Sequence, residues 1–565
     1  MTEVDVIDKP LLKDSGDENK PELVPAHTKP HYWLYKQGRE IWNRWAREAF
    51  IDENGNDDGR IDEWIKQAEE HIKDIEKSSH WGGGELTRDL QKKVDFYCNF
   101  KDCTPLSDQE KGDLEKKIRK EAKSKKYSLP SVDSEIDFIH TDWQEEVIFV
   151  GYVFPVRSNF IGSRFAFSTG FNYSSFVDYA DFRSAHFMGN ANFSFTIFGD
   201  EAYFSKSEFK QHVDFISSIF YEYVEFSSID IQESASFSWS RFQGSAYFDS
   251  SNFVGNTYFN LTVFTSVADF GSSSFESFVS FDSVVFVEHA DFSSSNFSSN
   301  ADFSSIAVSD VADFTLATFF LNVRFCGAEI SFLKLHKTVF EGDGNFEKAV
   351  FETLPKVSGV NLFGVFNFNE VIWPQINICK QPLDDALSYS QLKRLMNDSH
   401  LHHMEIFFFR KELLCRAESH KRSSKKLLDE DGRMYWFIKA YDKISECGDS
   451  ITRPLRVFLY LHIVMAVFYM FISDKLGALS KLYSFDFSGL YKGFYLSLRH
   501  SILFLPTSKK NYEAVMESMF PTVYSTGQFD LSYIIYVFAS GMQTVLSIGL
   551  IFLVGLAIRN HLRIK

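Results

Sequence analysis

From Phe138 to Ile330 an aromatic or aliphatic residue recurs at alternating intervals of six and five, an eleven-residue period that holds through seventeen repeats. An amphipathic helix would need apolar residues at i, i+3, i+4 and i+7, and a strand would alternate over a short run only. The period instead predicts a β-solenoid, in which each large side chain points inward and stacks on its equivalent one coil away. One series is occupied throughout by phenylalanine, and its members Phe182, Phe193, Phe204, Phe248, Phe270, Phe292, Phe303 and Phe314 are the predicted core ladder.

The residue two places before each large residue is nearly always small, as at Ala180, Thr196 and Ser251. Positions i−2 and i point the same way along a strand, so one large and one small residue would fill each face of a narrow core. The intervening residue points outward and is often Asp or Asn. This arrangement produces the strings A-D-F or A-N-F at 180–182, 191–193, 290–292, 301–303 and 312–314.

These strings resemble the pentapeptide-repeat family, whose consensus is A-(D/N)-L-x-x. The chain differs from that consensus by using Phe for Leu and by adding a sixth residue to every second unit. The resemblance covers residues 136–372 and implies a right-handed quadrilateral β-helix with about 22 residues per coil and about ten coils. The fold class expected for the whole chain is therefore mainly β, with helical regions on both sides of the solenoid.

The segments on either side of the repeat have helical character. Residues 1–30 are acidic, contain four prolines and have no apolar core, which predicts a disordered tail rather than a signal peptide. The helical character of residues 31–130 predicts helices. The segment Gly38 to Trp45 resembles the short helix that covers the open end of the first coil in pentapeptide-repeat proteins. Residues 380–452 predict a cytosolic helical connector, and 453–565 a membrane module.

Two segments near the C-terminus are long and apolar enough to span a bilayer, 457–473 and 531–558. Arg453 and Arg456 precede the first, and Arg559, Arg563 and Lys565 follow the second. Because positive charge favours the cytoplasmic side, both flanks are expected there. This predicts an integral protein of the inner or plasma membrane, with the repeat domain and both termini in the cytoplasm.

Between these spans, the aromatic segment 487–505 predicts a re-entrant or interfacial helix. A span, a re-entrant helix and a second span are the plan of two-transmembrane ion channels. Residues 385–565 resemble membrane-anchored pentapeptide-repeat proteins with such a module. The string F-L-P-T-S stands where a potassium filter would read T-x-G-Y-G, so potassium selectivity is unsupported. The predicted pore-lining residues are Ser540, Gln543, Thr544 and Ser547, with Arg499 and His500 near the pore mouth.

The alternative for the polar residues of the second span is hydrogen bonding between helices, with Gly541 and Gly549 at a contact face. The alternative for Arg499 and His500 is an interfacial helix with snorkelling side chains. Two spans cannot enclose an aqueous path alone, so a pore would require a homo-oligomer, a tetramer by analogy.

The net charge of −17 is concentrated in the repeat, where residues 136–372 contain 29 acidic and 11 basic residues. Direct nucleic-acid binding is not expected, because phosphate binding requires a basic surface. The acidic positions are expected to keep the β-helix soluble and to contact an unknown protein partner. A further alternative is DNA mimicry, which fluoroquinolone-resistance members of the pentapeptide-repeat family use against DNA gyrase.

Metal and catalytic signals are sparse. Asn54, Asn56 and Asp58 match the first half of an EF-hand loop, but Ile65 occupies the position of the bidentate Glu, so an acidic turn between helices is preferred to a calcium site. The histidines between 400 and 420 have no carboxylate or cysteine at a fixed ligand spacing. The six cysteines form no paired framework. No catalytic motif is present, so neither an enzyme nor a cofactor is expected.

The preferred interpretation is a cytosolic pentapeptide-repeat β-helix coupled to an oligomeric, channel-like pore of unknown selectivity. The first alternative is a membrane-tethered interaction scaffold in which the hairpin only anchors the solenoid and nothing is conducted. The second is the acidic DNA mimic that acts on a nucleic-acid enzyme.

Overall fold

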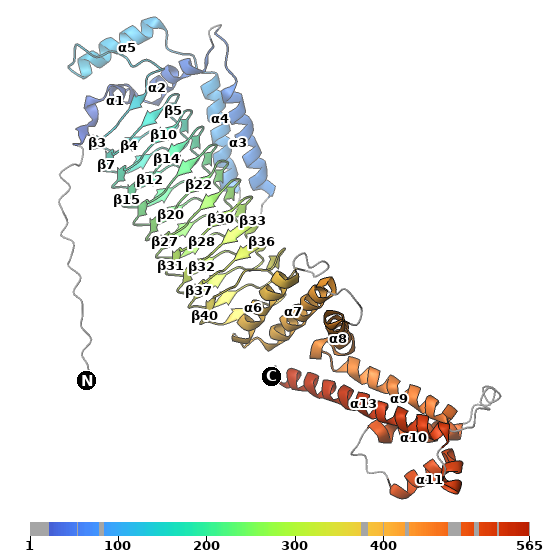
Figure 1. The fold of residues 1–565 in the computed structure, drawn as a ribbon. Coiled ribbons are helices and arrows are strands. Elements are labelled where there is room, and N and C mark those ends of the chain that lie inside the picture. Colours follow the sequence, from blue (N-terminus) through green and yellow to red (C-terminus); the bar gives the residue numbers. More distant parts are fainter. Residues whose placement is uncertain are drawn as a thin grey trace, which may run out of the picture. The chain divides into compact units, whose positions relative to one another are not determined.

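The computed structural model describes residues 22–52, 55–77, 84–374, 382–398, 400–423, 429–472, 487–501, 508–527 and 530–563. The chain forms two compact units, Met1–Pro374 and Gln375–Lys565. The first unit is a β-solenoid with helices at its N-terminal end, and the second unit is helical (Figure 1). Most of the predicted acidic tail, residue Asn54 of the predicted calcium loop, and residues 502–505 of the predicted re-entrant segment lie outside the described residues.

The solenoid runs from β2 (Ile136–Asp137) to β41 (Phe366–Asn367), and nearly every strand has two residues. A typical coil contains β10 (Ala180–Asp181), β11 (His186–Phe187), β12 (Ala191–Asn192) and β13 (Ile197–Phe198). The next strand, β14 (Ala202–Tyr203), pairs in parallel with β10, so that residues 22 apart lie side by side. One sheet has 11 strands, one per coil, which confirms the predicted solenoid at about one coil more than expected.

The rhythm changes near the C-terminal end of the solenoid. Two longer strands, β33 (Ala307–Asp313) and β36 (Glu329–Lys334), each continue around a corner, and their pairing shifts register between Val308 and Val311. In β36 the spacing between core residues shortens from six to five, from Ile330 to Leu335, which removes a turn residue so that two faces of the coil join into one strand. In β33 the six-residue spacing from Val308 to Phe314 is kept, and the strand follows the corner beside it.

The core of the solenoid consists of stacked phenylalanine rings, as predicted. The rings of Phe182 and Phe204 are 4.9 Å apart with an interplanar angle of 4°. Phe182 also meets Phe193 of the same coil edge to face at 5.5 Å and 84°. Both geometries are favourable for aromatic pairs. All eight predicted ladder residues are at most 1% exposed: Phe182, Phe193, Phe204, Phe248, Phe270, Phe292, Phe303 and Phe314.

A column of buried hydroxyl groups accompanies the rings. Ser251 is 2% exposed, and its Oγ donates to the carbonyl oxygen of Phe226 at 2.8 Å while accepting from the N–H of Ile229 at 3.1 Å. The same bond to a phenylalanine carbonyl recurs for Ser163, Ser174, Thr196, Ser207, Ser218, Ser240, Thr262, Ser273, Ser295 and Thr338. The small residues of the repeat are therefore also hydrogen-bond partners for turn carbonyls that face the core.

Replacing Ser251 by alanine is expected to lower the free energy of unfolding of the full chain by about 1 kcal/mol, because two buried backbone groups lose a partner. Denaturant unfolding would measure it. The matched control is Ser250→Ala, at an exposed neighbouring serine. Equal effects of the two substitutions would contradict a role for the buried hydroxyl.

Each coil contains turns in which a residue other than glycine has a left-handed backbone. The φ values of Ser184, Trp239 and Leu261 are 55°, 64° and 60°, and the pattern recurs every eleven residues along most of the solenoid. Such a conformation costs about 1–2 kcal/mol for a residue with a side chain. The cost is offset because the same residues donate to the next coil, as Ser184 does to the carbonyl of Ser205 at 3.0 Å. These turns were not predictable from their residues, since glycine, the usual sign of a left-handed backbone, is absent from most of them.

Helices α1 (Pro30–Tyr35) and α2 (Arg39–Ala46) cover the first coil, as predicted from the segment Gly38 to Trp45. Trp42 is fully buried and lies against Phe149 and Phe154 with ring centroids 6.2 and 5.5 Å apart. Its Nε1–H donates to the carbonyl of Val153 at 2.7 Å. Asn43 accepts from the N–H of Val153, so the helix supplies partners to strand groups that would otherwise be exposed.

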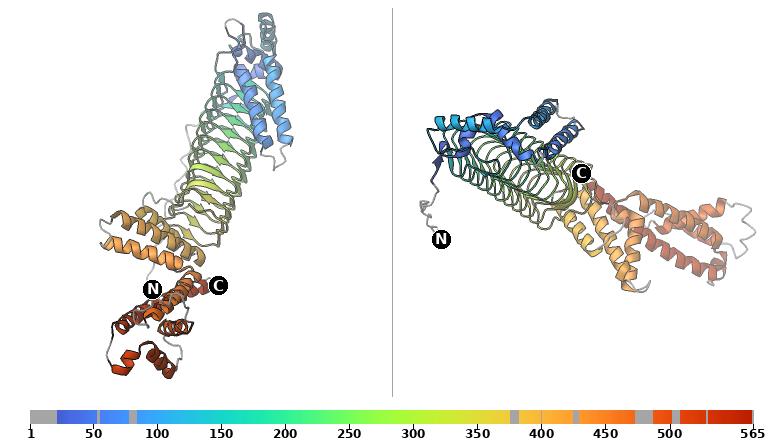
Figure 2. Two further views of the ribbon diagram at one scale, coloured as in Figure 1. Left: turned by 90° about the vertical axis from the view of Figure 1, so that its right-hand side faces the viewer. Right: turned by 90° about the horizontal axis from the view of Figure 1, so that it is seen from above.

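Helices α3 (Arg60–Lys77) and α4 (Gly84–Lys101) lie side by side along one flank of the solenoid, whereas α5 (Asp108–Glu121) lies at its N-terminal end (Figures 1 and 2). The Tyr97 hydroxyl contacts Ser175 Oγ at 2.9 Å, and Lys93 donates to the carbonyl of Phe195. Burial holds the pKa of Lys93 well below its usual value. The outward residues Ile197 and Ile219 are buried on this flank. Their apolar character at outward-pointing positions was a signal in the sequence that this face is covered.

The second unit begins with α6 (Pro382–Asp398), α7 (His402–Ser423) and α8 (Glu430–Ser445). It continues with α9 (Thr452–Ile472), α10 (Phe487–Ser501), α11 (Lys509–Met519), α12 (Pro521–Thr526) and α13 (Leu531–Arg563). Helices α9 and α13 are long and apolar enough to cross a membrane. They differ from the predicted spans because α9 begins at Thr452, where Ser450 Oγ accepts from the N–H of Arg453, and because α13 continues past Ile558 to Arg563.

Candidate functional site

Helices α9, α10 and α13 form a bundle in the second unit (Figure 1). The α9 and α10 backbones approach closely at Gly493, where an added Cβ would lie 2.2 Å from the carbonyl oxygen of Ala466. Small residues at such a crossing allow tight packing. A cluster of Tyr469, Leu496, Met516, Phe520 and Tyr536 fills the space between α9, α10, α13 and the segment α11–α12.

Gln543 lies at the centre of the bundle and is 1% exposed. Its Oε1 accepts from the hydroxyl of Tyr469 at 2.7 Å. Its Nε2 donates to Ser497 Oγ at 2.7 Å and to Ser501 Oγ at 2.9 Å. Ser547 extends the network, with its Oγ 2.8 Å from that of Ser501. One glutamine thus joins all three helices.

The other candidate pore residues also have partners inside the bundle. The Thr544 hydroxyl donates to the carbonyls of His500 at 2.9 Å and Ser540 at 2.8 Å, and Ser540 donates to the carbonyl of Val537. His500 Nε2 lies 2.7 Å from the hydroxyl of Tyr536. The guanidinium of Arg499 lies 3.7 Å from the centre of the Tyr512 ring. All six residues therefore lie at contacts within the chain.

The outward faces of the two long helices are apolar. The exposed residues of α13 between Leu531 and Ile558 are aliphatic, aromatic, Met or Gly, and Val545 and Phe538 are each 71% exposed. A Cβ at Gly541 or Gly549 would have no atom of the described chain within 4 Å. These glycines consequently face outward and make no contact between the helices of one chain.

A strip of tyrosine and acidic residues lies on the outside of the solenoid. The rings of Tyr179, Tyr203, Tyr223 and Tyr247 follow one another along the coils, with centroids 5.7, 5.9 and 5.3 Å apart. Acidic residues alternate with them, because Asp181 pairs with Tyr203 and Glu225 pairs with Tyr247 on neighbouring strands. Burial, and then the charge of Glu225, raise the pKa of Tyr223 to about 12. We call Tyr179, Tyr203, Tyr223 and Tyr247 with Asp181, Glu201, Glu225 and Asp249 the tyrosine strip.

Two arginines of the chain already occupy one half of the tyrosine strip. The guanidinium of Arg157 lies 4.1 Å from the centre of the Tyr179 ring, and that of Arg183 lies 5.2 Å from that of Tyr203. Arg183 also donates to Asp181 with Nε at 2.9 Å and Nη2 at 2.5 Å. A carboxylate that accepts two hydrogen bonds beside an aromatic face is a site that suits the planar guanidinium of arginine in particular.

The tyrosine strip was not predicted from the sequence. Its residues belong to two positions of the repeat, the outward strand residue and the turn residue two places earlier. They come together because coils stack at 22-residue intervals. Tyr179, Tyr203, Tyr223 and Tyr247 are spaced 24, 20 and 24 residues apart, which was the available signal.

No known protein family, curated protein or solved structure matches this chain. What the bundle and the tyrosine strip do must therefore follow from their own geometry and chemistry.

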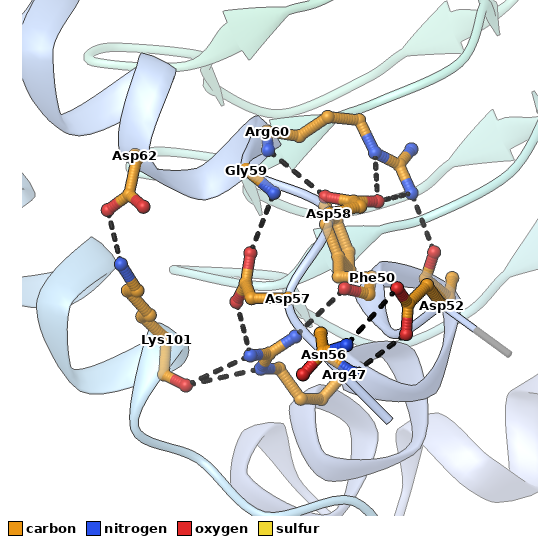
Figure 3. A network of polar contacts seen from close by, with 11 residues as sticks. Arg47, Phe50, Asp52, Asn56, Asp57, Asp58, Gly59, Arg60, Asp62 and Lys101 are labelled. Atoms are coloured by element: carbon orange, nitrogen blue, oxygen red, sulfur yellow. Dashed lines mark hydrogen bonds and ion pairs between the residues drawn. The ribbon is translucent and has the colours of Figure 1, made fainter. Parts of the chain in front are cut away.

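Arginine side chains pair with the carboxylates of the predicted acidic turn, the weak calcium candidate, among the described residues (Figure 3). Arg47 pairs with Asp57 at 2.5 Å, and Arg60 pairs with Asp58 at 2.6 Å. The N–H of Asn56 donates to Asp52 at 2.8 Å. The part of the loop that the structure describes contains no group of three acidic, His or Cys side chains arranged to hold a metal. The carboxylates form ion pairs with arginines at the start of α3.

The connector histidines pair with single carboxylates. His402 Nδ1 lies 3.2 Å from Glu405, and His420 Nδ1 lies 2.8 Å from Asp431. Across the described ranges of α6 to α8, no three ligand-type side chains converge. The geometry therefore corresponds to isolated ion pairs between and within helices.

Proposed function

We propose that this protein is a membrane-anchored docking scaffold, whose solenoid presents the tyrosine strip to an arginine-containing protein partner. The observation that carries the proposal is a repeated arrangement on the strip. Arg183 fills the site made by Asp181 and Tyr203. The same acid and tyrosine recur at Glu225 and Tyr247, where Ser227 replaces the arginine and donates to Asp249 at 2.5 Å.

The second half of the strip has the chemistry to bind an arginine from another protein. The half-buried Glu225 offers a carboxylate beside the half-buried Tyr247, and Asp249 lies two residues further along the chain. No cation of the described chain lies over the Tyr223 or Tyr247 ring. The negative charge of the solenoid would also steer a basic partner toward it.

The strands and the repeat strings support a more specific classification of the solenoid. We infer that the solenoid is of the pentapeptide-repeat type, a right-handed quadrilateral β-helix. Two observations favour that fold. A typical coil has four strands, and each A-D-F or A-N-F string places its first two residues in a strand and its Phe in the core. Its long axis and regular outer surface suit extended contacts with another protein.

The anchor is assigned to α9 and α13. Arg453 and Arg456 at the start of α9 and Arg559 near the end of α13 favour a topology with both flanks in the cytoplasm. The solenoid and both termini would then lie on the cytoplasmic side of an inner or plasma membrane.

A scaffold is favoured over a channel because the polar side chains of the bundle use one another. Gln543, Thr544 and Ser547 have hydrogen-bond partners in α9 or α10, so they need no water-filled path. The homo-oligomeric pore remains a prediction. Ion flux into liposomes containing the full chain is expected to equal that into empty liposomes. Flux that the Gln543→Leu variant alters would favour the pore.

The docking proposal predicts a preference for arginine. Full-length protein in nanodiscs is expected to bind an arginine-rich peptide more tightly than a lysine-rich peptide of equal length and charge. Only the arginine guanidinium can donate two hydrogen bonds to a carboxylate while it stacks on an aromatic ring. The double variant Glu225→Gln/Tyr247→Leu should weaken arginine-peptide binding about tenfold, since it removes one charged hydrogen-bond acceptor and one cation–π contact. Isothermal titration calorimetry measures both quantities.

The matched control is Glu276→Gln/Tyr258→Leu, which removes the same groups from other faces of the solenoid. It should leave binding unchanged. Equal loss in the two double variants, or equal affinity for arginine and lysine peptides, would mean that only net charge attracts the peptide, and the docking site would be rejected.

A further inference from the structure

Two cavities in the second unit lie next to each other along the C-terminal part of α13. The first is an apolar groove of about 500 Å³ between α8 and α13, lined by Phe437, Ile444, Val545, Phe552 and Leu553 among others. The second is a polar pocket of about 380 Å³, lined by residues that include His402, Glu405, Arg559 and Asn560. Tyr441 and Leu556 line both cavities, so the two lie next to each other.

The groove has the length of one leaflet. It follows α13 from Val545 to Leu556, and eleven residues of helix correspond to about 16 Å. Half of a hydrocarbon core of about 30 Å is close to this length. The polar pocket lies at the Arg559 end of the groove, where the proposed topology places the cytoplasmic lipid headgroups.

The charges of the polar pocket leave one cation available. Glu405 pairs with His402 at 3.2 Å, and Lys393, which also lines the pocket, pairs with Glu412 at 2.6 Å. The nearby acids Asp442 and Glu446 are held by Arg410 at 2.7 and 3.1 Å.

Arg559 is exposed and makes no hydrogen bond or ion pair with the part of the chain that the structure describes. Its guanidinium is thus available for an anion at the mouth of the groove. Asn560, whose Nδ2 donates to the carbonyl of Gly448 at 3.0 Å, fixes the end of α13 against the connector beside it.

We propose that this composite cavity binds an anionic phospholipid, with one acyl chain in the groove between α8 and α13 and the phosphate against Arg559. The two cavities offer matching chemistry for the acyl chain and for the phosphate of the lipid. Apart from Tyr441, the groove offers apolar side chains over the depth of a leaflet, and the pocket offers an arginine where the phosphate would lie. A bound lipid would contact both α8 of the connector and α13 of the anchor, because the groove lies between these two helices.

The proposal rests on membrane anchoring by α13, and the experiment separates the two. Full-length protein is reconstituted in nanodiscs of phosphatidylcholine with one-fifth phosphatidylglycerol, and native mass spectrometry counts the lipids that remain bound after release. The wild type is expected to retain phosphatidylglycerol in preference to phosphatidylcholine. Arg559→Gln should reduce this retention about fivefold.

Two further variants complete the test. Gly549→Phe places a ring in the groove, where a Cβ has no neighbour within 4 Å, so it should displace the acyl chain without disturbing the fold. Arg456→Gln removes the same charge from the start of α9, outside both cavities, and should retain phosphatidylglycerol as the wild type does.

Several outcomes would overturn the proposal. Equal retention by all variants would mean that lipid binds generally around the spans. Displacement of the lipid by inorganic phosphate alone would mean that the pocket takes a free anion. A wild-type dimer that becomes a monomer in Gly549→Phe would mean that a second copy fills the groove. Release of the protein from membranes at alkaline pH would instead reject the anchor itself, whatever the lipid count.

Discussion

Replacing Phe248 by alanine is expected to lower the free energy of unfolding of the full chain by about 4 kcal/mol. Phe248 is fully buried between Phe226 and Phe270, with ring centroids 4.9 and 4.8 Å away and nearly parallel planes. It also meets Phe237 and Phe259 edge to face. Alanine would leave a cavity in the middle of the column, where close-packed coils above and below prevent collapse. Denaturant unfolding followed by aromatic circular dichroism measures the loss.

The control for this substitution is Phe167→Ala, because the Phe167 side chain is 54% exposed on the outside of the solenoid. A change below about 0.5 kcal/mol is expected there. Phe248→Leu keeps most of the volume and should cost clearly less than Phe248→Ala. If Phe248→Ala and Phe167→Ala had similar effects, the stacked column would not be the main source of stability.

The second large effect is expected at Gln543. Gln543→Leu should destabilise the helical bundle by about 2 kcal/mol, because Tyr469, Ser497 and Ser501 lose a shared partner in a region with little water. Thermal unfolding of the full chain in detergent, followed by helical circular dichroism, gives the shift. Met542→Leu is the matched control, since Met542 is the neighbouring residue and 54% exposed.

An unchanged transition in Gln543→Leu would contradict the network. It would also remove the main argument for a scaffold over a channel, because the polar side chains would then be available to line a path. The stability measurement therefore complements the flux experiment, which tests conduction directly.

Much of the candidate anchor was recognisable from the sequence, and its internal arrangement was not. Hydropathy and flanking arginines identified both long helices, since these properties belong to short stretches of chain. The same residues supported either a pore or contacts between helices. Only the rotation of α13 about its axis decides that Gln543 faces Tyr469 and Ser497 while Gly541 and Gly549 face outward.

The solenoid, its core and its capped end follow from local patterns of the chain. A side chain every five or six residues with a fixed large and small alternation permits only one inward face per segment, so Phe182 and its equivalents had to stack. Trp42 and Trp45 were recognisable as a cap because the segment Gly38 to Trp45 resembles an aromatic capping helix, although three further helices separate it from the repeat in the sequence.

How the outer surface is used depends on contacts between distant parts of the chain. The helices α3 and α4 on the flank with Ile197 and Ile219, the tyrosine strip, and the neighbouring cavities near Arg559 all bring together residues that are distant in sequence. Their contacts depend on how coils stack and how helices rotate. A periodic core leaves those outward positions free to vary, so the period that determines the fold says nothing about the surfaces on which the proposed functions depend.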